Sequence, residues 1–149
     1  MSSRHRAREA ALQILYRYDI ATATASPIKQ PHDGQGMLDE LGRHFEHFKV
    51  PLAFREFAAN LVVGTLKQLT QIDLMLEKHA SNWKLTRMSP VDRNLLRMSV
   101  YEMLNFPEIP RNVTIDEAIE LAKQFGTADS PAFVNGVLDA VAQANPVAT

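Results

Sequence analysis

The segment from Ser89 to Phe106 constrains the fold more than any other part of the sequence. Its start combines Ser89, Pro90 and Asp92, the pattern of a helix N-cap, a first-turn proline and an acid near the positive end of the helix dipole. Apolar residues then occupy nearly every side of the predicted helix, at Val91, Leu95, Leu96, Met98, Val100, Tyr101, Met103 and Leu104. A helix that is apolar almost all round is surrounded by other elements. We therefore expect a bundle with this helix at its centre.

The chain before this segment is also predicted to be helical. Residues 4–21 carry apolar side chains at helical spacing, namely Ala7, Ala10, Ala11, Ile14, Leu15, Tyr18 and Ala21. Residues 22–36 contain two prolines and two glycines and predict a loop, after which a short helix is expected over 37–48. From 51 to 79 the apolar positions predict one helix about 40 Å long, unless it breaks near Gly64.

Two further helices are predicted after residue 106. Thr114 to Glu117 has the form of a capping box, and the helix that it starts should end at Gly126. Ser130 and Pro131 should open the last helix, in which Gly136 suggests that another backbone approaches closely.

No strand alternation or internal repeat interrupts the helical pattern. The predicted fold class is all-α, a compact bundle of six or seven helices. We expect one domain over 1–149, with helical subdomains of about 1–80 and 81–149.

Composition narrows the function classes. The chain has 149 residues, 46% of them hydrophobic and 22% charged, as in an ordinary soluble globular domain. Its net charge is -1, so any basic surface for nucleic acid must be local. The sequence has no cysteine, no secretory leader and no apolar run of about 18 residues, so we expect a cytoplasmic protein without membrane contact.

The sequence offers no catalytic constellation. It lacks the glycine-rich phosphate loops and the nucleophile motif of hydrolases. His44 and His47 would share a helix face, but no acid at suitable spacing completes a metal site. We therefore predict no enzymatic activity, no metal and no cofactor.

The N-terminus is the strongest candidate for a binding surface. Arg4, Arg6 and Arg8 precede the first acid, although short basic termini are commonly just solvated. Tyr16 is predicted to lie with His5 and Leu12 opposite the apolar stripe, where an aromatic ring beside arginines could stack on an unpaired RNA base. About four neutralised phosphates give a salt slope near -3, too weak alone for tight binding, so a protein partner is expected.

Four segments carry a family resemblance. RHRAREAALQILY (4–16), VDRNLLRMSVYEML (91–104), VTIDEAIELAKQFG (113–126) and DSPAFVNGVLD (129–139) resemble the NusB family, in that family's order. The resemblance does not cover residues 22–50. It implies an all-helical fold and transcription antitermination, through a complex with NusE on the boxA element of ribosomal RNA transcripts. That complex would join RNA polymerase and suppress premature termination.

The resemblance also implies roles for individual residues. Arg6, Arg8 and Tyr16 match the family's basic helix and RNA-facing tyrosine, and Asp129 and Phe133 match positions near the RNA. Asp92 matches an acid at the surface for RNA and NusE. Structural alternatives stay open, since Asp92 is also a helix-capping acid and Phe133 lies near the edge of a core stripe.

Two other functions remain open at this point. The same fold serves as the N-terminal domain of an rRNA cytosine methyltransferase, but 149 residues leave no room for a cofactor domain. The chain could also be a structural helical subunit without RNA contact. Some members of the family form homodimers that cover the RNA surface.

Overall fold

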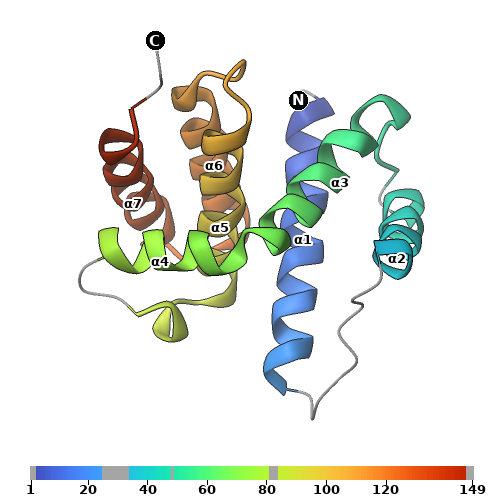
Figure 1. Cartoon of the computed structure of the whole chain (residues 1–149), viewed down its shortest axis with the longest axis horizontal. Helices are drawn as coiled ribbons and strands as arrows, with labels where there is room; N and C mark the ends of the chain where they lie inside the picture. The colour runs from blue at the N-terminus through green and yellow to red at the C-terminus, as the bar shows by residue number, and fades with distance from the viewer. Residues whose placement is uncertain (1–2, 25–33, 48, 81–83, 147–149) are drawn as a thin grey trace. The chain divides into compact units, whose positions relative to one another are not determined.

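The computed structural model of the chain describes residues 3–24, 34–47, 49–80 and 84–146. Within these ranges it contains seven α-helices, one short 3-10 helix and no β-strand (Figure 1). The elements are α1 (Ser3–Thr24), α2 (Gly34–His47), α3 (Leu52–Lys67), α4 (Leu69–His79), η1 (Leu85–Arg87), α5 (Pro90–Asn105), α6 (Arg111–Phe125) and α7 (Ser130–Ala144). The predicted all-α class is confirmed.

The chain divides into two compact units, Met1–Val63 and Gly64–Thr149. The sequence analysis placed the division near residue 80. The division lies earlier in the chain than predicted, because α4 packs against α5 and α7 and so belongs with the C-terminal helices.

Helix α5 is the centre of the second unit, as its sequence predicts. It packs against α4, α6 and α7. Leu95, Leu96 and Val100 have no exposed surface, and Met98 has almost none. The Ser89 hydroxyl caps its start by accepting a hydrogen bond from the Asp92 amide at 3.1 Å. The predicted N-cap at Ser89 and the predicted central position of this helix are therefore confirmed.

Helix α6 starts differently from the prediction. Its first residue is Arg111, directly after Pro110, so the capping box expected at Thr114 is wrong. The Thr114 hydroxyl instead donates to the Glu102 carboxylate of α5 at 2.5 Å, and both residues are buried. This contact gives the buried carboxyl group of Glu102 a hydrogen-bond donor and joins α5 to α6. The predicted end at Gly126 is confirmed.

The long helix predicted over 51–79 is broken in two at Gln68, between α3 and α4. Gly64 lies inside α3, and a Cβ atom there would be 2.0 Å from Cζ of Tyr101. Gly64 therefore permits a close approach of the α5 side chain. The close approach predicted at Gly136 is wrong, because no atom lies within 4 Å of a Cβ built there.

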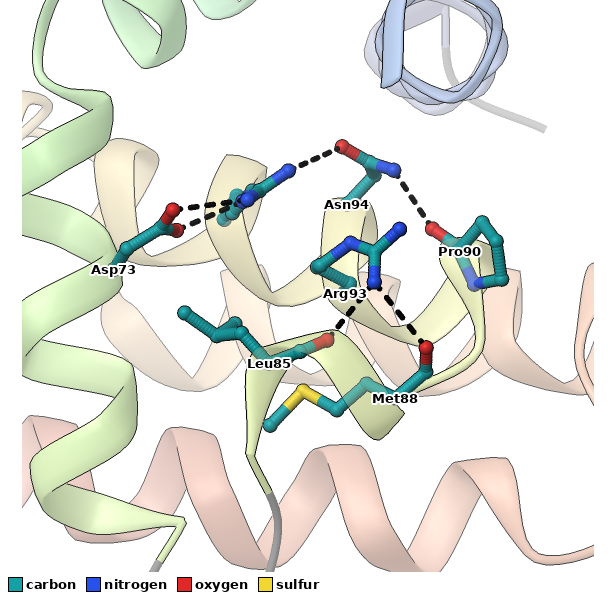
Figure 2. A network of polar contacts seen from close by, with 7 residues as sticks. Asp73, Leu85, Met88, Pro90, Arg93 and Asn94 are labelled. Atoms are coloured by element: carbon teal, nitrogen blue, oxygen red, sulfur yellow. Dashed lines mark hydrogen bonds and ion pairs between the residues drawn. The ribbon is translucent and has the colours of Figure 1, made fainter. Parts of the chain in front are cut away.

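A polar network joins α4, η1 and α5 within the second unit (Figure 2). The guanidinium of Arg97 donates from Nε and Nη2 to the two carboxylate oxygens of Asp73, at 2.8 and 2.9 Å. It also donates to Oδ1 of Asn94, whose Nδ2 donates to the Pro90 carbonyl at 2.8 Å. These contacts fix the start of α5 relative to α4.

The first unit contains α1, α2 and most of α3. Helix α1 begins at Ser3 and extends to Thr24, three residues beyond the predicted end. Residues 34–36, predicted as part of the loop, begin α2, whereas 25–33 and 48 lie outside the described residues. His44 on α2 is buried, and desolvation, with smaller contributions from Arg17 and His47, lowers its pKa to about 4.

Candidate nucleic-acid interface

The arginines at the start of α1 differ in exposure. Arg4 and Arg6 are exposed, whereas Arg8 has only 3% of its surface accessible. The predicted basic run therefore offers two outward cations rather than three. Arg17, about three turns beyond Arg6 on α1, is a third exposed cation.

Arg4 and Arg8 meet the same aromatic ring within the first unit. The guanidinium carbons lie 5.5 Å (Arg4) and 5.4 Å (Arg8) from the ring centroid of Phe57 on α3. Both distances are inside the range of a cation–π contact. Residues 4 and 8 are one helical turn apart, so α1 presents both side chains to the same side. Phe57 was not among the predicted site residues.

Tyr16 lies on the outward side of α1, as predicted, with 38% of its surface exposed. The neighbours expected for it are wrong, since His5 and Leu12 are 7% and 2% exposed. The buried face of α1 is wider than one apolar stripe, because His5, Arg8 and Leu12 are buried alongside the predicted row. Tyr16 therefore shares the exposed side with Arg6 and Arg17.

Tyr18 belongs to the opposite part of α1. It is half-buried, and burial raises the pKa of its hydroxyl. Tyr16 and Tyr18 thus have different environments despite their proximity in sequence, which makes them a matched pair for experiments.

A cavity of about 410 Å³ in the second unit brings three predicted residues together. Its lining combines the start of α5, the turn before it and the start of α7: Arg87, Met88, Ser89, Asp92, Thr127, Asp129 and Phe133. The sequence analysis named Asp92, Asp129 and Phe133 but not Arg87 or Thr127. Arg87 lies in η1, where no helical periodicity could single it out.

One hydrogen-bond acceptor among the residues that line the cavity has no donor among the described residues. One carboxylate oxygen of Asp92, Oδ1, is buried and has no hydrogen-bond partner among the described residues. The capping hydrogen bond of α5 uses the Asp92 backbone amide and the Ser89 hydroxyl, so it does not occupy the Asp92 carboxylate. A buried acceptor without a partner carries a desolvation cost that a donor from a bound molecule or water would remove.

A tight turn into α7 contributes Thr127 and Asp129 to the lining of this cavity. The buried Ser130 hydroxyl accepts a hydrogen bond from the Thr127 amide at 2.9 Å. A Cβ atom on Gly126 would lie 2.4 Å from that hydroxyl oxygen, so glycine is needed for this turn. The turn leaves Asp129 exposed and Phe133 half-buried at the cavity.

The sequence model of the NusB family matches residues 5–143. The chain belongs to the NusB family. It is 42% identical to the transcription antitermination protein NusB of Geotalea uraniireducens, over 98% of both chains. It is also similar to the solved structure of T. maritima NusB, at 33% identity, a TM-score of 0.77, and coverage of 96% of this chain and 92% of that one. A crystal structure of the antitermination factors NusB and NusE in complex with dsRNA matches at 28% identity and TM-score 0.78, over 97% and 98% of the chains.

The two groups of candidate residues differ in their chemistry. The exposed side of α1 offers two or three cations and one aromatic ring, which suit phosphates and an unpaired base. The cavity combines Arg87 with two acids and an aromatic ring, which suits a ligand that presents both donors and an apolar face.

In residues 3–24, 34–47, 49–80 and 84–146, no group of three or more histidines and acids could hold a metal ion. None of the helices in the described part of the chain is long and apolar enough to cross a membrane.

Proposed function

We propose that this chain is a non-enzymatic transcription antitermination factor that binds boxA RNA together with NusE. The observation that carries the proposal is the exposed side of α1, where Arg6, Tyr16 and Arg17 project from one helix whose other side is core. The family membership and the similarity to a NusB–NusE–dsRNA complex support it. We expect the protein to act in the cytoplasm, on the transcript emerging from RNA polymerase.

The proposed RNA contact has two parts. Arg4, Arg6 and Arg17 contact phosphates, and Tyr16 stacks on an unpaired base. In the second unit, Asp129 and Phe133 contact the RNA, and Asp92 faces the RNA and NusE surface. Each of these residue roles is a proposal that mutation can test.

The strength of this surface argues for a protein partner. Three cations on single-stranded RNA correspond to a salt slope of about -2, a modest electrostatic contribution at cellular salt. NusE would add contacts and so raise the affinity for RNA.

A titration of boxA RNA with and without NusE tests the function. We expect the affinity for boxA to rise at least about tenfold, or 1.4 kcal/mol, when NusE is present. A scrambled RNA of equal length is the control, and its affinity should rise much less. Equal affinity with and without NusE would overturn the partner role, and equal affinity for both RNAs would overturn the boxA assignment.

A further inference from the structure

The contact between Phe57 and two arginines has a property that ordinary core packing does not explain. Arg4 is exposed and Arg8 is buried, yet both guanidiniums lie within 5.5 Å of the centroid of one ring. Two like charges are thereby held near each other at the start of α1. Like charges at residues i and i+4 of a helix repel, and the negative face of an aromatic ring offsets part of that repulsion.

Stacking also decides which donors of Arg4 remain available. A guanidinium stacks through its flat face, whereas its five N–H donors lie in its plane and point outward from its edge. An arginine stacked on Phe57 can therefore still form a bidentate contact with a phosphate. The ring restricts the long side chain before the ligand arrives, so less conformational entropy is lost on binding.

From these contacts we infer that Phe57 is a positioning residue for RNA binding, which holds the guanidinium of Arg4 oriented for a phosphate. Arg8 is the buried one of the two arginines at Phe57, and it adds positive potential without contacting RNA itself, because only 3% of it is exposed. This inference rests on the proposed RNA-binding function. It adds Phe57 of α3, which lies outside the arginine-rich start of α1, to the residues that support RNA binding.

The test compares boxA RNA affinity, with NusE present, for variants of Phe57. Phe57→Leu keeps an apolar side chain but removes the ring, and we expect it to weaken RNA binding about two- to fivefold. Phe57→Tyr keeps the ring and should restore the affinity of the natural chain. Phe54→Leu is the matched control, since Phe54 is also half-buried on α3 but has no stacked cation among the described residues. It should bind RNA normally.

A second pair of variants tests whether Phe57 acts through Arg4. In an Arg4→Ala background, Phe57→Leu should cause no further loss of RNA affinity. Arg4→Lys keeps the charge, so the salt slope should be unchanged, but affinity should fall about as much as in Phe57→Leu because an ammonium group cannot stack as a guanidinium does. Arg4 is exposed, so Arg4→Lys should fold normally, and normal RNA binding by this variant would overturn the inference even if Phe57→Leu folds poorly.

Each outcome has one meaning. Normal binding by Phe57→Leu or by Arg4→Lys would overturn the inference, as would equal weakening by Phe57→Tyr and Phe57→Leu. A Phe57→Leu effect that persists in the Arg4→Ala background would also overturn it. If these variants bind like the natural chain, only the positioning role fails. If the natural chain itself shows no affinity for boxA RNA, the proposed function fails and the inference fails with it.

Discussion

Arginine side chains are used differently in the two units of the molecule. In Gly64–Thr149, three arginines donate to acceptors of their own unit. Arg93 binds the carbonyls of Leu85 and Met88, Arg97 binds Asp73 and Asn94, and Arg111 binds the carbonyls of Ala142 and Asn145 (Figure 2 shows the first two). In Met1–Val63, Arg4 and Arg6 are exposed at the start of α1.

Each unit also contains an arginine that departs from this pattern. Arg55 of the first unit is bound internally, to the Val50 carbonyl and the Glu46 carboxylate. Arg87 of the second unit is exposed, and it lines the cavity with Asp92. Arg4, Arg6, Arg17 and Arg87 are thus exposed at the candidate sites, whereas the internally bound arginines tie helices and turns together. Stability and RNA affinity should therefore respond to different arginines.

The largest expected effect on stability lies in the apolar core of the second unit. Leu95→Ala should lower the free energy of unfolding by about 2–5 kcal/mol, because Leu95 is fully buried at the centre of α5. Urea denaturation followed by circular dichroism measures this change. A loss below about 0.5 kcal/mol would show that α5 is not the central helix of its unit.

Removing a structural arginine should have the next largest effect on folding. Arg97→Ala leaves Asp73 without its two charged hydrogen bonds, and we expect a loss of about 1.5–3 kcal/mol in unfolding free energy. Arg87→Ala, at an exposed position, is the control and should change stability by less than about 0.5 kcal/mol. The folded Arg97→Ala protein should bind RNA normally. Weakened RNA binding at unchanged stability would contradict the structural role.

Tyr16 gives a smaller effect, and on RNA rather than on folding. Tyr16→Ala should lose about 1–3 kcal/mol of boxA RNA affinity if its ring stacks on a base, and unfolding free energy should change by less than about 0.5 kcal/mol. Tyr18→Ala should instead lower stability by about 1 kcal/mol, since Tyr18 is half-buried. Melting curves and RNA titrations on both variants measure this. Early melting by Tyr16→Ala would show that the outward orientation of Tyr16 is wrong.

Local patterns predicted much of the fold. The position of α5 followed from its cap and its apolar residues, the end of α6 followed from Gly126, and the start of α7 followed from Ser130 and Pro131. The capping box at Thr114 failed because the partner of its hydroxyl, Glu102, belongs to another helix. The break at Gln68 has no proline or glycine to mark it. Both errors arise where tertiary contacts override a local preference.

The candidate site was predictable only in part. Family resemblance selected Asp92, Asp129 and Phe133, which the structure brings to one cavity. The burial of Arg8 could not be predicted, because it depends on contacts such as that with Phe57, in a distant helix. Phe57 itself looked like a core residue at helical spacing. Sequence can locate arginines, but only packing shows which of them are available to a ligand.

The salt dependence of boxA RNA binding, measured with NusE present, tests the central claim most directly. The natural chain, Arg6→Ala and Arg97→Ala are compared at several salt concentrations. The account predicts that Arg6→Ala reduces the magnitude of the logarithmic salt slope by about 0.7, the value for one lost phosphate contact on a single strand, and melts normally. Arg97→Ala should keep the natural slope and melt early. The reverse, an unchanged slope in Arg6→Ala and a reduced slope in Arg97→Ala, would contradict the assignment of RNA binding to the exposed arginines of α1.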